Sequence, residues 1–365
     1  MNILILTSHL NIGGIPRYVI NLAKYLKRRG ERVLVGASPG VWQSKLIQES
    51  IEVISLPLNT KSILSFKIRE SFKILNKFLE AEKIDIIHAN TRVTQFLGFR
   101  LFKARKVPYI SAFHGCYRPH IFRRLLKCEG VKTIAVSNYV KEHLIKKLKI
   151  AEEKIRVIYN GIEIIKGYQD EDTERRINRL KEKIKAYPLL GTVSRLTPEK
   201  NIASLIKMMP FILKKFPLAK LVILGRGRQE PDLKELVKKL ALGEKVLFFK
   251  NIGPLVLFKI LDVFISLSKG EPFGFSVVEA QSAGVVTLVS NSGAFPEIIE
   301  DKSTGIILKE GTPQEVVEAL KLVLENPQFK QRLIENAQRK INDFFTIEIM
   351  GKNTYNLYKE VLEEK

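Results

Sequence analysis

The sequence predicts an α/β protein with two domains, each containing a doubly wound parallel β-sheet. Three observations support this prediction. The chain has 365 residues, which suits two domains better than a single core. Strand-like apolar runs alternate with helical patterns in both halves, as parallel sheets with crossover helices require. The alternation stops in a charged segment poor in core residues, 167–185, and then restarts.

The first half opens with a strand expected at 2–7, a glycine turn at Gly13-Gly14 and a helix whose apolar face includes Val19 and Leu22. Further strands are expected at 32–37, 52–56, 84–88, 109–113, 133–136 and 155–158. We expect this first domain to span residues 1–166.

The second half carries its own set of strand-like runs. They are expected at 189–193, 221–224, 246–249, 263–266 and 287–290. Thr312-Pro-Gln-Glu315 has the form of a capping box with proline at the first helical position, so helices should close the chain. We expect a charged connector at 167–186, a second domain at 187–345 and a last helix at 346–365 that packs back on the first domain. The buried face of that helix should contain Ile347, Met350, Leu357, Tyr358 and Val361.

Composition narrows the class of protein. Hydrophobic residues make up 45% and charged residues 27%, which excludes a mainly disordered chain. The two cysteines, Cys116 and Cys128, fit free thiols in a reducing compartment. The N-terminus lacks signal-peptide features, and no stretch approaches the roughly 18–20 uncharged residues of a membrane span. We expect a cytoplasmic protein, with a peripheral place on the inner face of the plasma membrane left open.

The net charge of +23 is concentrated in the first half. Residues 1–165 hold 29 basic and 12 acidic residues, whereas the remaining 200 hold 32 and 26, so the halves carry +17 and +6. Between Asp85 and Glu129 there is no carboxylate. Such a field attracts nucleic acid, anionic lipid or a phosphorylated substrate, and charge alone does not choose among them.

The most informative motif is 271–279, EPFGFSVVE, in which two carboxylates straddle a strand-to-helix turn. Glu271 is expected in the loop, where it can accept hydrogen bonds from ligand hydroxyls, and Glu279 on the helix. The free amides around 273–275 would form an anion site at the helix N-terminus. A pair of glycosidase carboxylates is disfavoured, because the two side chains face different ways.

A second turn, 191–201, places Arg195 and Lys200 beside another helix N-terminus. Two cations there suit a diphosphate, through charge-assisted hydrogen bonds and the helix dipole. Gly225-Arg226-Gly227 is a weaker glycine signal. Because paired Rossmann-like domains bind ligands at the carboxyl ends of their strands, we expect the site in the cleft between them.

These motifs together resemble the retaining glycosyltransferases of the GT-B fold, specifically the GT4 family. The resemblance covers nearly the whole chain. It rests on Gly13-Gly14, His114-Gly115, AVSNYV at 135–140, VIYNGIE at 157–163, SRLTPEKN at 194–201, EPFGFSVVEA at 271–280 and SGAFPEII at 292–299. The set of two spaced glutamates with the upstream arginine and lysine is highly specific.

The resemblance implies roles for the residues of the second domain. Arg195 and Lys200 would bind the diphosphate of a nucleoside-diphosphate sugar, with a UDP-sugar favoured. Glu279 would bind the ribose hydroxyls and Glu271 the transferred sugar. Backbone amides of Phe273, Gly274 and Phe275 would contact sugar and phosphate.

In the first domain, the resemblance implies that Gly14 closes over the phosphates and that His114 lies beside the donor sugar. A structural histidine at a strand end is the alternative for His114. Asn90 stands where the family often has a second histidine, Gly293-Ala294 replaces a glycine pair, and Lys250 replaces a glycine. These departures weaken any inference about which sugar is transferred.

No cofactor or metal is expected, because cations and helix amides can stabilise the leaving diphosphate. Asp170-Glu171-Asp172, the one D-x-D motif, lies in the connector. Cys116, His120 and Cys128 match no standard zinc spacing. As the resemblance implies, the acceptor would attack on the same face and give its proton to the leaving phosphate oxygen.

The expected function is therefore hexosyl transfer to a saccharide or lipid-linked acceptor, anionic in character, in cell-envelope glycan synthesis such as that of lipopolysaccharide. Tyr117–Lys127 mixes apolar and basic residues and suits an anionic membrane, although a plain amphipathic helix fits as well. A glycogen- or starch-type synthase, or a sugar-phosphate synthase, would share the donor site. A basic nucleic-acid-binding protein leaves Glu271 and Glu279 unexplained, and no nucleic acid is expected.

Overall fold

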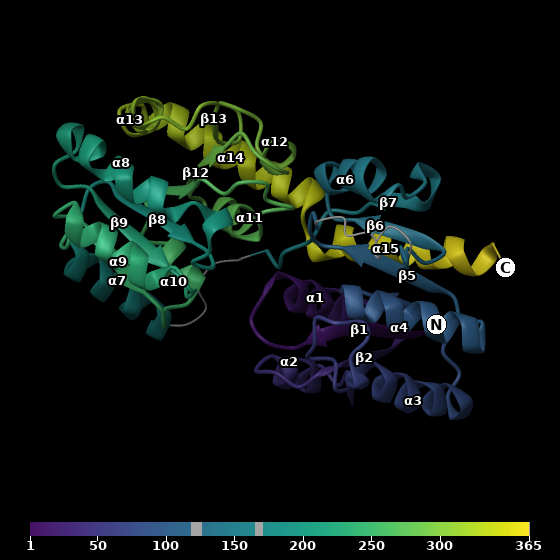
Figure 1. The fold of residues 1–365 in the computed structure, drawn as a ribbon. Coiled ribbons are helices and arrows are strands. Elements are labelled where there is room, and N and C mark those ends of the chain that lie inside the picture. The colour runs from purple at the N-terminus through teal and green to yellow at the C-terminus, as the bar shows by residue number, and fades with distance from the viewer. Residues whose placement is uncertain (118–125, 165–170, 365) are drawn as a thin grey trace. The chain divides into compact units, whose positions relative to one another are not determined.

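The computed structural model describes residues 1–117, 126–164 and 171–364. The chain forms two compact units, one of Met1–Glu163 with Phe344–Lys365 and the other of Ile164–Asp343 (Figure 1). The last helix, α15 (Ile347–Glu363), is therefore part of the same unit as the first half of the chain.

The described residues of the first unit contain a seven-stranded parallel sheet, in the order β3-β2-β1-β4-β5-β6-β7. The strands are β1 (Asn2–His9), β2 (Arg32–Ser38), β3 (Glu52–Ser55), β4 (Ile86–Ala89), β5 (Tyr109–Phe113), β6 (Lys132–Ala135) and β7 (Ile155–Val157). This confirms the predicted doubly wound sheet. The strand order reverses between β1 and β4, which marks the point where ligands of such sheets bind.

Helices cover this sheet because their apolar faces match its apolar strands. The helices are α1 (Gly14–Arg28), α2 (Gln43–Gln48), α3 (Phe66–Ala81), α4 (Arg92–Arg105), α6 (Asn138–Leu148) and α15. Helices α3 and α4 pack on the sheet face that contains Leu4 and Leu6. Helix α15 packs against α1 at Gly351, where a Cβ atom would lie 2.2 Å from the Tyr25 ring. The glycine thus permits the close approach of the first and last helices.

Helix α15 begins and packs as its sequence pattern indicated. The Thr346 hydroxyl accepts a hydrogen bond from the Ile349 amide at 3.2 Å, which caps the N-terminus. The predicted apolar face, Ile347, Met350, Leu357, Tyr358 and Val361, is buried.

Within the described residues, the second unit contains a six-stranded parallel sheet in the order β10-β9-β8-β11-β12-β13. The strands are β8 (Leu189–Val193), β9 (Lys220–Leu224), β10 (Val246–Phe249), β11 (Val263–Ser266), β12 (Val286–Ser290) and β13 (Ile306–Leu308). Strand β13 was not predicted, because three residues are too few to show a strand pattern. The order reverses between β8 and β11.

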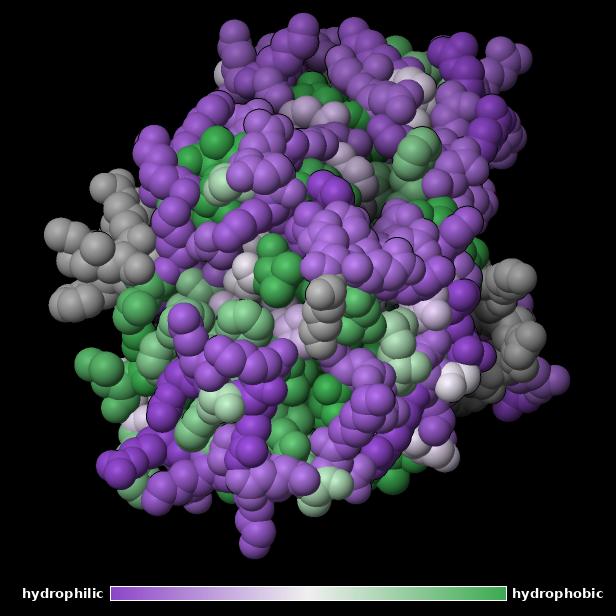
Figure 2. All heavy atoms as spheres, turned by 90° about the vertical axis from the view of Figure 1, so that its right-hand side faces the viewer, coloured by the Kyte–Doolittle hydropathy of each residue, from purple (hydrophilic) through white to green (hydrophobic). Residues whose placement is uncertain are grey.

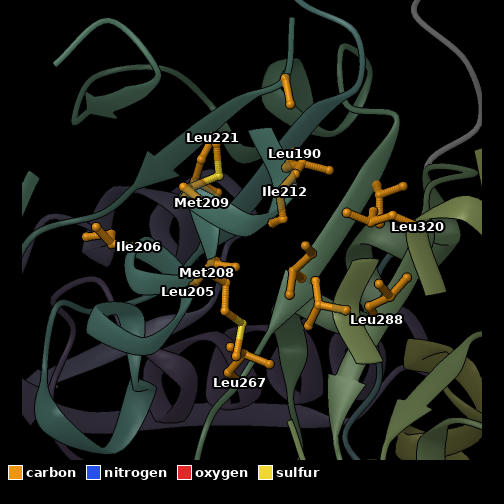
Figure 3. Packing of buried hydrophobic residues seen from close by; sticks show 14 of the residues in the cluster. Leu190, Leu205, Ile206, Met208, Met209, Ile212, Leu221, Leu267, Leu288 and Leu320 are labelled. Carbon is orange, nitrogen blue, oxygen red and sulfur yellow. The ribbon is translucent and has the colours of Figure 1, made fainter. Parts of the chain in front are cut away.

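The core of the second unit lies between this sheet and its helices. The helices are α7 (Glu171–Ile184), α8 (Ile202–Lys215), α9 (Glu230–Lys239), α10 (Pro254–Phe258), α11 (Phe275–Ser282), α12 (Phe295–Ile298), α13 (Pro313–Leu324) and α14 (Pro327–Phe344). Figure 3 shows side chains of α8, among them Leu205 and Met209, gathered with strand residues such as Leu190 and Leu288. Burying this apolar surface stabilises the sheet that carries the site.

Part of the segment expected as a connector is the helix α7. Ile177 and Ile184 are buried, and their spacing of seven residues places them on one face of the helix. Helix α7 packs against α10 in the second unit. The segment looked poor in core residues because this buried face is narrow.

The face of the molecule drawn in Figure 2 is mostly hydrophilic, with apolar side chains in separate small groups. Among the helices of the described chain, none has both the length and the apolar character of a membrane span.

Candidate functional site

The two loops at the switch point of the second sheet carry most of the predicted residues. Strands β8 and β11 are hydrogen-bonded neighbours, so the loops that leave their carboxyl ends lie side by side. The loop after β8 contains Arg195 and the short 3-10 helix Pro198–Lys200. The Lys269 amide in the loop after β11 donates to the Glu199 carbonyl at 2.7 Å, which joins the loops.

Lys200 and Glu271 meet across these loops. The Lys200 Nζ atom lies 2.5 Å from Glu271 Oε2, and the two side chains are only 17% and 13% exposed. The sequence placed both at the donor site but did not predict that they pair. An ammonium group has three donors, so Lys200 can hold Glu271 and still donate to a phosphate oxygen. Glu271 retains a second oxygen that can accept from a ligand hydroxyl.

Arg195 is arranged differently from Lys200. Its side chain is 73% exposed, and its Nη2 atom lies 3.8 Å from Glu199 Oε1, a weak surface pair. Its guanidinium can therefore turn toward an anion with little cost. Glu279 lies on α11, as the sequence predicted, and its side chain is half-buried.

Gly274 forces the turn into α11. It has a φ of 102°, in the left-handed region, and a Cβ atom there would lie 2.8 Å from the Phe295 ring. Helix α11 then begins at Phe275, and the amides of Val277 and Val278 both donate to the Gly274 carbonyl, at 3.0 and 3.2 Å. The Phe273 side chain is buried and its ring packs edge to face on Phe275, with centroids 5.2 Å apart. The turn at which the amide site was predicted is thus packed against aromatic rings.

A third loop, after β12, supports Glu271 from the other side. The Ala294 amide donates to the Glu271 carbonyl at 2.8 Å, and the Ser292 hydroxyl accepts from the Gly270 amide at 2.8 Å. At Gly293, φ is 65°, and a Cβ atom would lie 2.3 Å from the Glu271 backbone nitrogen. Gly293 stands out in the sequence only as part of a departure from the family motif, and no role was predicted for it.

The G-x-G after β9 fits a fourth loop against the first. A Cβ atom on Gly225 would lie 1.8 Å from the Ser194 carbonyl oxygen, and one on Gly227 would lie 2.2 Å from that of Leu196. Both glycines allow the loop after β9 to press on the loop that carries Arg195. Four neighbouring strands therefore contribute to one edge of the second sheet.

In the first unit, His114 lies just after β5, beside the end of β4. Its Nε2 atom is 3.0 Å from the Asn90 Oδ1 atom. Burial lowers the pKa of His114 to about 3, so the imidazole is neutral at physiological pH. Gly14 is the first residue of α1 and is exposed, after a Gly13 in extended backbone.

Three aromatic or imidazole side chains that were not predicted at the site lie behind His114. The Tyr18 ring packs edge to face on His114, with centroids 4.6 Å apart, and on His88 at 5.8 Å. The His88 Nδ1 atom lies 2.6 Å from the Tyr358 hydroxyl of α15. Burial, with a smaller effect of His114, lowers the pKa of His88 to about 3. Only the fold brings these residues together, because they come from α1, β4 and α15.

The zinc and D-x-D alternatives fall partly outside the described residues. His120 and Asp170 are not described, nor is the side chain of Asp172. Burial raises the pKa of the Cys116 thiol to about 11, which disfavours the thiolate that zinc needs. In the described part of the chain, no three His, Cys, Asp or Glu side chains gather as a metal-binding group. Cys116 and Cys128 are free thiols.

The second unit thus offers cations, helix amides and a carboxylate at one sheet edge, a combination that suits an anion attached to a group with hydroxyls. The first unit offers a neutral imidazole at the carboxyl edge of its own sheet.

Two family models match the chain. Residues 12–165 match the model described as Glycosyltransferase Family 4, and residues 170–340 match that described as Glycosyl transferases group 1. An uncharacterized glycosyltransferase of Methanocaldococcus jannaschii is 29% identical over 96% of this chain and 95% of its own length. An alpha-monoglucosyldiacylglycerol synthase of Acholeplasma laidlawii is 25% identical over 97% of this chain and 95% of its own.

Solved structures share the fold. The crystal structure of Anabaena HepE in complex with UDP and glucose has a TM-score of 0.84, at 22% identity, and the match covers 98% of this chain and 99% of that one. A glycosyltransferase from Rickettsia africae has a TM-score of 0.87 at 24% identity, with 100% and 99% covered.

Proposed function

The chain belongs to the GT4 family of glycosyltransferases with the GT-B fold, and from that premise we propose that it is a retaining, metal-independent hexosyltransferase. Its donor would be a nucleoside-diphosphate sugar, with a UDP-sugar favoured. Its acceptor would be a saccharide or a lipid-linked saccharide of the cell envelope, anionic in character.

The observation that carries the donor assignment is the pairing of Lys200 with Glu271 at the switch point of the second sheet. One side chain suits a diphosphate and the other suits a sugar hydroxyl, so a single ligand with both groups fits the pair. Arg195 and the amides after Gly274 add positive potential for the diphosphate. Glu279 would bind the ribose. The complex of Anabaena HepE with UDP and glucose supports a UDP-sugar for this chain.

In the proposed reaction, the glycosidic bond breaks as the acceptor hydroxyl attacks the same face of the sugar. Negative charge grows on the leaving diphosphate, and Lys200, Arg195 and the helix amides stabilise that charge. The leaving phosphate oxygen takes the proton of the acceptor hydroxyl. Glu271 would hold the sugar, and His114, neutral at physiological pH, would lie beside it.

The acceptor assignment rests on the first unit. The loops after β1 and β3 begin at the same sheet edge as His114. Ile12 and Leu64 in these loops are 76% and 88% exposed, and Phe66 at the start of α3 is 72% exposed. Five basic residues and no acidic one occur in these loops, the loop after β2 and the residues next to them, that is, in 10–17, 39–48 and 56–69. Apolar side chains among cations suit an anionic amphiphile or a membrane surface. The Acholeplasma relative, named for a diacylglycerol product, supports a lipid acceptor.

The segment Tyr117–Lys127, which the sequence suggested as a membrane contact, falls mostly outside the described residues, since 118–125 are not described. The proposal that it meets an anionic membrane at the inner face of the plasma membrane therefore rests on its sequence and on the +17 charge of residues 1–165.

Nucleotide sugars should be screened for thermal stabilisation of the full chain, followed by transfer assays with membrane extract as the acceptor source. A bound donor at a hundredfold excess over its Kd should add about 2.7 kcal/mol to the free energy of unfolding. No stabilisation by any nucleoside-diphosphate sugar would contradict the donor assignment. Formation of glucan or of a free sugar phosphate would favour the synthase alternatives.

The acceptor side is tested by co-sedimentation with anionic and zwitterionic vesicles at low and high salt. The wild type should sediment with anionic vesicles at low salt, and Leu64→Ser with Phe66→Ser should reduce that binding. Phe211→Ser with Leu218→Ser is the matched control, because those exposed apolar residues lie in the second unit. Equal loss in both pairs, or no binding by the wild type, would contradict the membrane proposal.

A further inference from the structure

The orientation of the Asn90 side chain is fixed by its surroundings. Asn90 is buried, and its Nδ2 atom lies 3.2 Å from the Leu6 carbonyl oxygen and 3.3 Å from that of His88. Carbonyl oxygens only accept hydrogen bonds, so the amide nitrogen must face them. The Oδ1 atom then faces His114, at 3.0 Å from Nε2.

This orientation decides which nitrogen of His114 carries the proton. An amide oxygen only accepts, so Nε2 must be the donor in the bond to Asn90. A neutral imidazole has one N–H group, and the Nδ1 atom therefore has a lone pair. Within the described residues, no side chain or backbone group donates to that atom.

The packing around His114 holds the ring in this position. The Tyr18 ring lies against it at an interplanar angle of 64°. Tyr18 is itself held against His88, which is bonded to the Tyr358 hydroxyl of the last helix. The titratable groups packed on this side are Tyr18, His88 and Tyr358, and burial disfavours the charged form of each.

We propose that Asn90 is a positioning residue that holds His114 in the Nε2–H tautomer, so that Nδ1 accepts a hydrogen bond from a hydroxyl of the bound ligand. His114 then orients the ligand and transfers no proton. The identity of that ligand as a donor sugar rests on the proposed function, whereas the tautomer does not. Asn90, a departure from the usual histidine of the family, thereby acquires a function in this chain.

The tautomer can be measured without any activity, by nitrogen NMR of the full chain with 15N-labelled histidine. The sequence has five histidines, and the His114→Gln variant identifies the signals of His114. We expect a protonated Nε2 and an unprotonated Nδ1 in the wild type, unchanged from pH 8 to pH 5. A protonated Nδ1 atom, or two protonated ring nitrogens at pH 7, would overturn the proposal, and the wild-type spectrum alone is enough to show either.

Substitutions of Asn90 then test whether this residue sets the tautomer of His114. Asn90→Ala should give a mixture of tautomers at His114, and Asn90→Asp should raise the pH at which the ring becomes doubly protonated, because a carboxylate stabilises the cation. Asn138→Ala is the matched control, since Asn138 is an asparagine at the start of α6 that bonds to Tyr159 in the same unit. An unchanged His114 spectrum in both Asn90 variants, if folded, would overturn the proposal.

The functional readout separates this inference from the proposed function. Asn90→Ala should lower kcat for sugar transfer about 3- to 10-fold, the effect of one hydrogen bond, without changing the affinity for UDP alone. In a His114→Gln background, the same change should have no further effect. Absence of transferase activity with the expected spectrum would contradict only the proposed function. Transfer by a protein whose His114 carries its proton on Nδ1 would contradict only this inference.

Discussion

The Lys200 ammonium and the Glu271 carboxylate are paired at 2.5 Å, 71 residues apart in sequence, where the strand order of the second sheet reverses. Both side chains are largely buried. Water therefore solvates neither charge well, and each charge depends on the other for its stabilisation. A ligand that binds here must compete with this pair or join it. In the proposed donor site, this pair would therefore link the stability of the fold to ligand binding.

Glu271→Gln tests that link. The amide still accepts from Lys200 but carries no charge, so the lysine loses its counterion while the packing is kept. We expect lower stability and slower sugar transfer, with affinity for the diphosphate kept or increased. Calorimetry and UDP titration measure the two effects. Glu199→Gln is the control, because Glu199 is half exposed and only weakly paired. Equal effects of the two substitutions would contradict a special place for Glu271.

Gly274→Ala should destabilise the second unit by about 1–3 kcal/mol and weaken donor binding, because a non-glycine residue at a φ of 102° is strained and its Cβ meets Phe295. Gly253→Ala is the matched control, since no atom lies within 4 Å of its Cβ position and its φ is negative. Thermal unfolding and UDP titration compare the two. A Gly274→Ala protein with wild-type stability would show that the turn is not constrained as described.

The pKa values of His88 and His114 predict loss of stability in acid. Both are lowered from 6.5 to about 3 in the folded chain, so the unfolded chain binds more protons below pH 6.5. The contribution of the two neutral histidines to the free energy of unfolding is then fully present above pH 6.5, and it is lost as the pH falls from there toward 3. The slope is about 1 kcal/mol per pH unit for each histidine.

His88→Phe should make this pH dependence shallower, although the loss of the bond to Tyr358 lowers stability at every pH. The measurement is the free energy of unfolding between pH 7 and pH 5. An identical slope in the wild type and His88→Phe would contradict neutral burial of His88.

Metal independence is a further prediction, and it follows from the proposal that Lys200 and Arg195 supply the positive charge at the diphosphate. Transfer should persist in excess chelator. Activity that is lost on chelation and restored by magnesium or manganese would contradict it.

The strands and their alternation could be predicted because parallel buried strands are short apolar runs, visible in the sequence. Residues of the candidate site could be proposed from the sequence only where a motif is local, as at 194–201 and 271–280, and their roles stay predictions. The Lys200–Glu271 pair was not predictable, because it depends on β8 and β11 being neighbours across the strand reversal. Tyr18, His88 and Tyr358 come together only because α15 packs on α1, which no local pattern indicates.

The most direct test of the proposed donor site is a calorimetric titration of UDP and UDP-sugars into the full chain in the presence of chelator. We compare the wild type with Lys200→Met, Arg195→Met and the control Lys215→Met, whose lysine lies at the far end of α8. We expect the wild type and the control to bind, and we expect affinity to fall about 10- to 100-fold in Lys200→Met and Arg195→Met, the scale of a hydrogen bond to a charged group. Equal affinity in all four folded proteins, or no binding by the wild type, would contradict the proposed donor site.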